Sequence, residues 1–522
     1  MRQLFGQGLG TALARAETPA PRIPTILVFG VWLGLAVLGA ATHEIGKDEG
    51  RALLLALSAD SLWAVPAAIQ GEGHPALWYV LLRAAHMVWN DTVVLQILGV
   101  GLTATGIYIF LSRAPLPLWW KLLFAFSGLP LYEYSVVPRN YGISLLILFL
   151  ICLVLPDRKS SPLLLGGLLF ALAQTNVHSA LLVPFLGAVW LWDHWWRDGR
   201  PHIRIDAPVI LIVGLMAIGL LAAVLTVYPP RHTGVTDAMA QSYFRESYIK
   251  TLAIVILEPG HFYRILTGMP ALTATIVVYV ATFGLLRWPI LLLAALGGLW
   301  SSALFFALVY NGGYRHQGLW FIYLIALYWI GIVRNRREEH APLPWLMLPY
   351  RIALYGALPL LLLINCVTGY ENFTRDFRVE VSKSRALGAV INASPTLRNA
   401  IIVAEPDELN EALGYYIDNT AFLLREQKYG RVATWSAKEQ GELTLGQIFA
   451  RMKMLRQETG RPVIAVLFVP VVAAQAGTVF PLWWGRQFTY SAEDARAFLA
   501  ATRELPLGTP SPLEDFHAYL LE

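Results

Sequence analysis

The sequence predicts a polytopic α-helical membrane protein of about eleven transmembrane helices plus interfacial helices, followed by a C-terminal soluble α/β domain. Hydrophobic residues make up 56% of the 522 residues, and charged residues only 14%. Soluble domains carry about 25% charged residues, so the composition itself indicates a membrane protein. Long apolar runs fill the chain up to residue 369, and shorter aliphatic runs separated by polar segments follow.

The apolar runs give the expected spans. A helix needs about 20 apolar residues to cross the hydrocarbon core. Runs of this kind occur at 24–42, 92–112, 118–137, 139–156, 162–177, 179–196, 206–228, 270–287, 289–310, 316–333 and 346–369. A further run, "HPALWYVLLRAAHMVW" at 74–89, is short and contains Arg83 and His86. If it lies along the outer interface, the basic clusters at 157–159 and 334–338 fall on the cytoplasmic side, as the positive-inside rule requires.

This topology predicts a cytoplasmic N-terminus and a retained first span. It also predicts two domains, a transmembrane module over 1–369 and an extracytoplasmic α/β domain over 370–522. Two outer loops belong to the first, 43–91 with its interfacial helix and 229–269. In the second, "AIIVAEPD" and "PVIAVLFVP" resemble buried strands, whereas 407–428 and 442–458 are expected to be helical.

Ionisable and polar side chains gather at the predicted outer face. The stretch "HEIGKDEGR" at 43–51 directly follows the first span. Ionisable groups near membrane depth are costly unless they are paired or functional, and the middles of the spans are nearly free of charge. This favours an enzyme at the membrane surface over a pore or transporter. The candidate residues are Asp48, Glu49, Arg51, Glu72, His74, Arg139, Tyr141, His178, Arg315 and His316, with Arg231 and His232 in the second outer loop.

Each candidate also has a purely structural interpretation. The "KDEGR" stretch is compatible with a solvated loop; if it is helical, Asp48 and Arg51, three residues apart, share a face and could pair. Arg139 and Arg315 are typical interfacial anchors, and His178 is typical of a packing residue. The chain lacks the spacing of a zinc site and the glycine loops that bind nucleotides. Its net charge of +5 lies in short clusters between apolar spans, so nucleic-acid binding is not indicated.

The order of these motifs resembles the GT-C superfamily of polytopic glycosyltransferases, in particular aminoarabinose transferases and protein O-mannosyltransferase-like enzymes. "DEGR" at 48–51 resembles their Asp-Glu-x-Arg element, "GHPALWYVLLR" at 73–83 their "HPPLYYLLL" element, and "EYSVVPRNYGISLLILFL" at 133–150 their Arg-Tyr span. The motifs cover about the first 180 residues, and the remainder agrees in architecture. Ala76 replaces the second proline, and His74 stands where aminoarabinose transferases have lysine.

The resemblance implies a glycosyltransferase of the bacterial inner membrane. It would move a single sugar from a polyprenyl-phosphate donor to an extracytoplasmic lipid, glycan or protein by inverting displacement, without a cofactor. Asp48 would be the base, with Glu49 as second choice, and Arg51 would orient Asp48 or reach the phosphate. Arg139 and Arg315 would bind the phosphate. The lesser substrate contacts would be Glu72, His74, Tyr141, His178 and His316.

Other functions remain open from the sequence. A GT-C enzyme that transfers oligosaccharides would use a divalent metal, and Asp48, Glu49 and Glu72 offer oxygen ligands suited to Mg²⁺ or Mn²⁺. A transporter or flippase of lipid-linked glycans would predict inverted repeats and broken helices with polar groups at mid-membrane, and the sequence shows neither. A scaffold whose outer domain binds a partner would not need acidic and basic residues at the span ends, but it could tolerate them. If the acceptor is itself a phosphate, Asp48 would act as an electrostatic or orienting residue.

Overall fold

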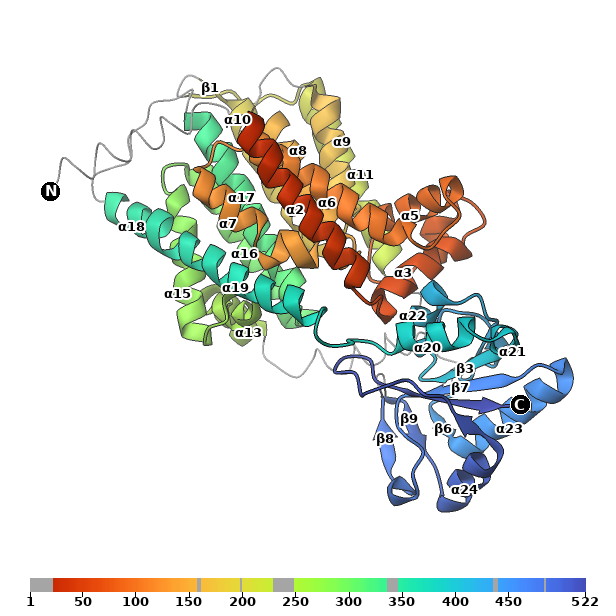
Figure 1. Cartoon of the computed structure of the whole chain (residues 1–522). Helices are drawn as coiled ribbons and strands as arrows, with labels where there is room; N and C mark the ends of the chain where they lie inside the picture. Colours follow the sequence, from red (N-terminus) through yellow and green to blue (C-terminus); the bar gives the residue numbers. More distant parts are fainter. Residues whose placement is uncertain are drawn as a thin grey trace.

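The computed structural model of the chain describes residues 22–156, 161–197, 200–228, 248–335, 346–434, 440–482 and 485–522. A helical body is followed by a smaller domain of mixed strands and helices, and the chain passes between them after α19 (Leu358–Arg375) (Figure 1). The predicted combination of apolar helices and a C-terminal sheet is therefore confirmed. Residues 1–21 lie outside the described residues.

Within the described residues, six helical stretches have the length and apolar composition to cross a membrane. They are α2 (Arg22–Thr42), α6 (Val94–Arg113), α11 (Ala207–Val227), α16 (Pro289–Leu308), α17 (Tyr314–Asn335) and the run from α18 (Met347–Ile352) through η5 (Ala353–Ala357) to α19. Further helices of the body are α7 (Leu118–Ala125), α8 (Tyr141–Val154), α9 (Pro162–Ala173), α10 (Val177–Trp195), α13 (Tyr248–Leu257) and α15 (Ala271–Thr282). Each predicted span thus falls on helical structure, but the number eleven and the orientation stay predictions.

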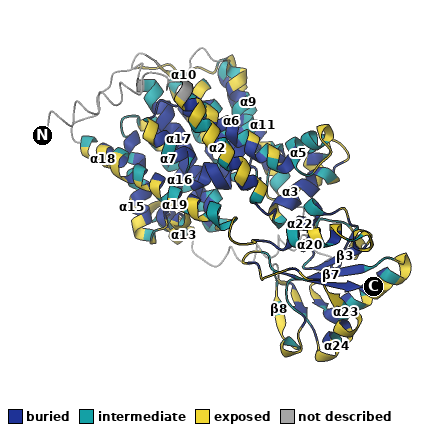
Figure 2. Cartoon of the chain, viewed as in Figure 1, coloured by how far each residue is buried: buried dark blue, intermediate teal, exposed yellow. Residues whose placement is uncertain are grey.

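Burial divides the helices into an outer ring and an inner core. Outer helices expose large apolar side chains, such as Leu27 on α2 and Leu225 on α11. Helices that are apolar on every face belong in a hydrocarbon environment. The central helix α17, in contrast, buries Trp320, Tyr323 and Trp329 almost completely. Figure 2 shows this contrast between exposed outer helices and a buried interior.

The span expected at 118–137 is broken in the structure. α7 ends at Ala125, and a π-helical turn, η1 (Leu129–Glu133), follows before the chain becomes irregular. Gly128 permits this path, because a Cβ there would lie 2.8 Å from the Cα of Gly369. Irregular turns of this kind are frequent at functional sites. Here the turn carries Glu133, which sequence reasoning did not select.

The two predicted outer loops contain helices. The first holds α3 (Lys47–Ser58), α4 (Val65–Ala68) and α5 (Leu77–Val88), so the helix expected at 74–89 begins three residues later. The positive φ angles of Gly71 and Gly73, 85° and 82°, form the turn before it. In the loop expected at 229–269, α13 is followed by η2 (Pro259–Phe262) and α14 (Arg264–Thr267). Arg231 and His232 lie outside the described residues.

The C-terminal domain is built on a six-stranded sheet in the order β10-β11-β7-β3-β4-β5. Central β3 (Ile401–Glu405) is parallel to β7 (Val463–Leu467) and β4 (Ala421–Leu423). β11 (His517–Leu521), β10 (Arg503–Glu504) and β5 (Lys428–Tyr429) pair antiparallel. Both apolar runs predicted to be strands are confirmed as β3 and β7. Their residues are buried on both faces, as uniformly apolar strands require.

Helices cover the two faces of this sheet. α20 (Ser384–Asn392) and α22 (Leu409–Tyr416) contribute to one buried cluster, and α23 (Leu445–Thr459) and α24 (Ala492–Ala501) to the other. A small sheet joins β6 (Glu442–Thr444), β9 (Gln487–Thr489) and β8 (Val479–Pro481). The helix expected at 407–428 is wrong beyond Tyr416. Asn419 donates hydrogen bonds to the carbonyls of Leu397 and Ala400, which directs the following residues into β4.

Candidate active site

A cavity of about 1290 Å³ lies between the outer-loop segments and three helices of the body. Its polar end is lined by Asp48, His74, Glu133, Arg139, Arg315 and His316. Apolar side chains of three helices form much of the rest, including Leu181 and Phe185 of α10, Leu220 and Ala223 of α11, and Phe305 of α16. The cavity therefore suits an amphiphile with a charged head group and an apolar chain.

Asp48 stands at the polar end on the first turn of α3. Its Oδ2 lies 3.5 Å from the Nη1 atom of Arg139, and its side chain is 62% exposed, open to the cavity. The Arg139 guanidinium is the main cause that holds the pKa of this carboxyl below its ordinary value. Arg315, Lys47 and His74 act in the same direction, and burial opposes them. Asp48 is therefore a carboxylate at neutral pH.

Two arginines supply positive charge beside this carboxylate. Arg139 contacts Asp48 and lies with its Nη2 atom 3.3 Å from Nε2 of His74. Arg315 pairs through Nε with Oε2 of Glu133 at 3.1 Å. A guanidinium has five N–H donors, and these contacts within the described residues use only part of that number. Both arginines therefore retain donors for an anionic ligand.

Three histidines complete the polar end. Burial, reinforced by Arg139, lowers the pKa of His74 to about 3, so its imidazole is neutral and hydrogen bonds without charge. The rings of His178 and His316 lie 5.0 Å apart at the beginnings of α10 and α17. Nδ1 of His316 accepts a hydrogen bond from the Gly313 amide. Neither ring nitrogen of His178 has a partner within the part of the chain that the structure describes.

Two predicted residues lie beside the cavity rather than in its wall. Glu49 is buried, and its Oε2 accepts a hydrogen bond from the Gly46 amide at 2.6 Å, which caps α3. This position favours a structural role over the second-choice base expected from the sequence. Tyr141 is also buried. It stacks on Tyr134 and makes a T-shaped ring contact with His316, so it packs against that histidine.

Arg51 and Glu72 lie elsewhere than expected, because they pair with each other away from the polar end of the cavity. The predicted pair of Asp48 and Arg51 is replaced by a pair of Asp48 and Arg139. Arg51 donates instead to both carboxylate oxygens of Glu72, and it also pairs with Glu411 of the C-terminal domain. It therefore neither orients Asp48 directly nor reaches the polar end of the cavity. The sequence could not indicate this, because Glu411 lies 360 residues away.

A second cavity of about 210 Å³ adjoins the first. The two share Asp48, Glu133 and Arg315. The smaller cavity is lined mainly by polar residues, among them Glu44 and Glu49 of the body and Ser382 and Glu514 of the C-terminal domain. Asp48 thus stands between an amphipathic cavity and a polar one.

Several lining residues were missed from the sequence. Glu133 is an acidic residue inside an otherwise apolar predicted span. Burying a charge there costs free energy, so such a residue is a functional candidate. Tyr310 and Tyr314 also line the large cavity. The apolar wall gave no signal, because α10, α11 and α16 are apolar over most of their length. Among the described residues, no group of three or more His, Cys, Asp or Glu side chains is arranged to hold a metal ion.

Comparison with known proteins gives one kind of match. No protein-family model matches the chain, and no curated protein matches it significantly. The crystal structure of ArnT from Cupriavidus metallidurans bound to undecaprenyl phosphate is similar, with 11% identity and a TM-score of 0.48, over 96% of this chain and 98% of that one. The apo structure of the same protein has 11% identity and a TM-score of 0.47, over 95% and 97%.

The structural likeness is to ArnT, at 11% identity and with TM-scores of 0.48 and 0.47. At this identity and TM-score it carries no weight for the activity. The function of this chain is therefore derived from the cavity and its side chains.

Proposed function

We propose that this chain is a membrane glycosyltransferase that moves a single sugar from a polyprenyl-phosphate donor to an extracytoplasmic acceptor. The observation that carries the proposal is that the large cavity has a charged end and a mainly apolar remainder. The guanidinium groups of Arg139 and Arg315 and the carboxylates of Asp48 and Glu133 stand at one end, and three mainly apolar helices form most of the remaining wall. A sugar linked through phosphate to a long apolar chain has the same division of charge and apolar surface.

The donor would bind with its phosphate at Arg139 and Arg315 and its prenyl chain along α10, α11 and α16. Guanidinium binds phosphate oxygens through paired N–H donors. Positive charge fixed at the departing phosphate stabilises the negative charge that develops there as the glycosidic bond breaks. The sugar would then lie near Asp48, at the boundary with the smaller polar cavity.

In the transfer step, the acceptor oxygen attacks the anomeric carbon from the side opposite the phosphate. The new C–O bond forms while the bond to phosphate breaks, and polyprenyl phosphate leaves with the electron pair. Asp48 takes the proton of an acceptor hydroxyl. Because Arg139 holds the pKa of Asp48 low, the carboxylate is a weak base while it is paired with Arg139. A bound phosphate competes for Arg139 and thereby makes Asp48 more basic.

If the acceptor is a phosphate group, no proton needs to be removed. Asp48 would then stabilise the positive charge that develops on the sugar ring. The acceptor, whether lipid, glycan or protein, would enter through the smaller cavity, which the C-terminal domain helps to form. We place this side of the protein outside the cytoplasm, in the bacterial inner membrane, because the basic clusters between spans then face inward.

The binding step can be tested without knowing the sugar. Purified protein in lipid nanodiscs would be titrated with a polyprenyl phosphate and with the matched polyprenol, which lacks the phosphate. We expect the phosphate to bind more tightly. Arg139→Gln and Arg315→Gln should each weaken its binding, since a hydrogen bond to a charged group contributes about 1.5–3 kcal/mol, or roughly 10- to 150-fold in Kd.

Arg83→Gln is the matched control, because Arg83 lies on α5 in the same outer loop and lines neither cavity. Its affinity for polyprenyl phosphate should equal that of the wild type. Equal binding of phosphate and alcohol, or an equal effect of all three substitutions, would contradict the proposed donor site.

A further inference from the structure

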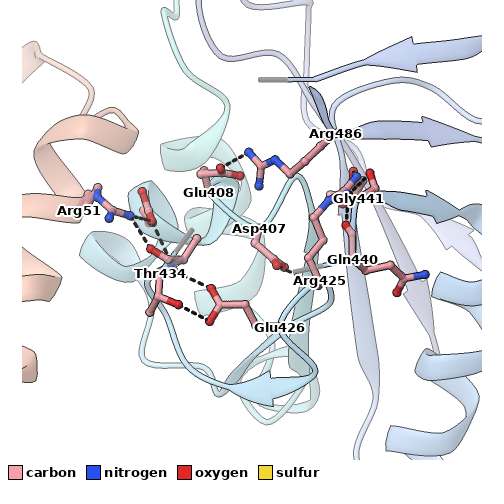
Figure 3. Close-up of polar contacts among 12 residues, drawn as sticks. Arg51, Asp407, Glu408, Arg425, Glu426, Thr434, Gln440, Gly441 and Arg486 are labelled. Atoms are coloured by element: carbon pink, nitrogen blue, oxygen red, sulfur yellow. Dashed lines mark hydrogen bonds and ion pairs between the residues drawn. The ribbon is translucent and has the colours of Figure 1, made fainter. Parts of the chain in front are cut away.

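Arg51 joins its own helix to two other segments, which lie 21 and 360 residues away in the sequence. Its Nε and Nη2 atoms donate to Oε1 and Oε2 of Glu72 at 2.6 and 2.7 Å, the paired geometry in which guanidinium binds carboxylate most strongly. Its Nη1 donates to Oε1 of Glu411 and, at 3.0 Å, to the carbonyl of Ala433. The side chain of Arg51 extends from α3 toward the C-terminal domain and is buried there (Figure 3). We call Arg51, Glu72 and Glu411 the interdomain clamp.

Two arms of the clamp hold segments that line the large cavity. Arg51 is on α3, three residues after Asp48, and therefore about one turn away. Glu72 lies between Gly71 and Gly73 in the turn that leads to His74, and all three of its neighbours line the cavity. The bidentate contact of Arg51 with Glu72 thus fixes the distance between the Asp48 helix and the His74 turn.

The third arm comes from the C-terminal domain. Glu411 is on α22, and its Oε1 also accepts a hydrogen bond from the Ala433 amide at 3.1 Å. α22 presses directly on α3 at this point, since a Cβ at Gly50 would lie 2.2 Å from the carbonyl oxygen of Glu411. The Ala433 amide of its own domain therefore orients the Glu411 side chain that pairs with Arg51.

We propose that Glu411 is a positioning residue for the transfer reaction, acting through Arg51 to fix Asp48 and His74 at the donor cavity. This inference rests on the proposed function. It assigns the C-terminal domain a part in building the active site, besides any part in recognising the acceptor. A misplacement of a catalytic group by about 1 Å costs on the order of 100-fold in rate, so a clamp on the helix of Asp48 acts on turnover.

Other contacts keep the C-terminal domain docked when the clamp is weakened. The hydroxyl of Tyr416 accepts from the Ile45 amide at 2.7 Å, and Glu514 accepts from the Lys47 amide at 2.8 Å. Glu44 accepts from the Ser382 amide at 2.9 Å. Loss of the charge on Glu411 should therefore change the placement of α3 without separating the domains.

The test compares Glu411→Gln, Arg51→Lys and the double variant. Glutamine keeps an acceptor oxygen at Glu411 but removes the charge, and lysine keeps the charge of Arg51 but loses the paired geometry. Tyr415→Phe is the matched control. It removes a 2.8 Å hydrogen bond from the same helix α22 to Gln96 on α6, which does not line the cavity. Donor consumption, polyprenyl phosphate affinity and unfolding temperature would be measured for each.

We expect each single clamp variant to lower kcat by about 10- to 100-fold with unchanged affinity for polyprenyl phosphate and retained cooperative unfolding. The double variant should lose no more than the worse single variant, because the residues act as one unit. Tyr415→Phe should match the wild type. The inference would be overturned if Glu411→Gln had the wild-type kcat. It would also be overturned if the fold-losses of kcat of the two single variants multiplied in the double variant.

Should Glu411→Gln fail to fold, Glu411→Asp, which keeps the charge on a shorter arm, takes its place with the same expected loss of kcat. The two proposals fail in different ways. A wild-type protein that consumes no donor contradicts the proposed function, whereas an active wild type with fully active clamp variants contradicts only the role of Glu411.

Discussion

The carboxylate of Asp48 and the guanidinium of Arg139 pair across 3.5 Å at the polar end of the large cavity, although 91 residues of sequence separate them. In this pair the two opposite charges compensate each other. A donor phosphate must compete with Asp48 for the same guanidinium. Binding of the donor and activation of the carboxylate are therefore linked through one arginine.

This link predicts a shift in the pH dependence of the reaction. Arg139 is the largest cause of the lowered pKa of Asp48, and burial acts in the opposite direction. Arg139→Gln should therefore raise this pKa. Because transfer requires the carboxylate, the rate falls as the pH drops through the pKa, and the acid limb of kcat/KM against pH should move to higher pH. Arg139→Lys keeps the charge and should leave the limb nearly in place. Superimposable acid limbs for wild type and Arg139→Gln would contradict the assignment of Asp48.

The apolar wall should be sensitive to added volume. Ala223 on α11 is buried and lines the cavity, so Ala223→Phe would occupy the path of the prenyl chain. Overfilling a packed site costs about 1–3 kcal/mol, or roughly 5- to 150-fold in Kd. We expect weaker binding of a long-chain polyprenyl phosphate in a titration. Ile218→Phe on the outward face of the same helix, where Ile218 is 58% exposed, should bind as the wild type does. Equal affinities of the two variants would argue against this path.

The contact of α3 with α22 should show in the stability of the protein. A methyl group at Gly50 would meet the backbone of Glu411, which cannot move aside as a flexible side chain can. Gly50→Ala should therefore destabilise the folded protein by about 1–3 kcal/mol, seen as a lower unfolding temperature in detergent. Gly30 on α2 has open space around it. Gly30→Ala should raise the unfolding temperature slightly or leave it unchanged. A Gly50→Ala variant as stable as Gly30→Ala would show that the domains do not pack in this way.

Chelation separates the proposed enzyme from a metal-dependent GT-C transferase. Glu72 has both oxygens engaged by Arg51, and Glu49 caps α3 through Gly46. These contacts compete with metal binding, so we expect EDTA to leave donor consumption unchanged. Activity that is lost with EDTA and restored by Mg²⁺ or Mn²⁺ would instead favour the oligosaccharide-transferring alternative, with Asp48 as a ligand.

Much of the architecture follows from the sequence. Apolar runs locate the helices because crossing a membrane requires length and composition that few soluble segments have. The same reasoning brought Asp48, His74, Arg139, His178, Arg315 and His316 to one membrane face, and the structure places all six around one cavity. Their functional roles stay predictions. The strands β3 and β7 were predictable because strands buried on both faces are uniformly apolar.

The remainder depends on contacts that local sequence does not encode. Arg51 and Asp48 share a helix and were expected to pair, but the buried carboxylates of Glu72 and Glu411 take the guanidinium. Glu133 reaches the cavity from an irregular turn that apolar length does not predict. The strand at 421–423 replaces part of an expected helix because its partner, β3, is supplied by the tertiary fold.

The most direct test of the account is consumption of donor by the purified protein in lipid. A panel of radiolabelled polyprenyl-phosphate sugars would be incubated with wild type, Asp48→Asn and the control Glu49→Gln, in which the amide oxygen can still cap α3. We predict that the wild type consumes one donor. Glu49→Gln should remain active, and Asp48→Asn should be slower by about 10²- to 10⁴-fold while still binding polyprenyl phosphate. A wild type that consumes no donor, or an Asp48→Asn variant as active as the wild type, would contradict the proposed transferase.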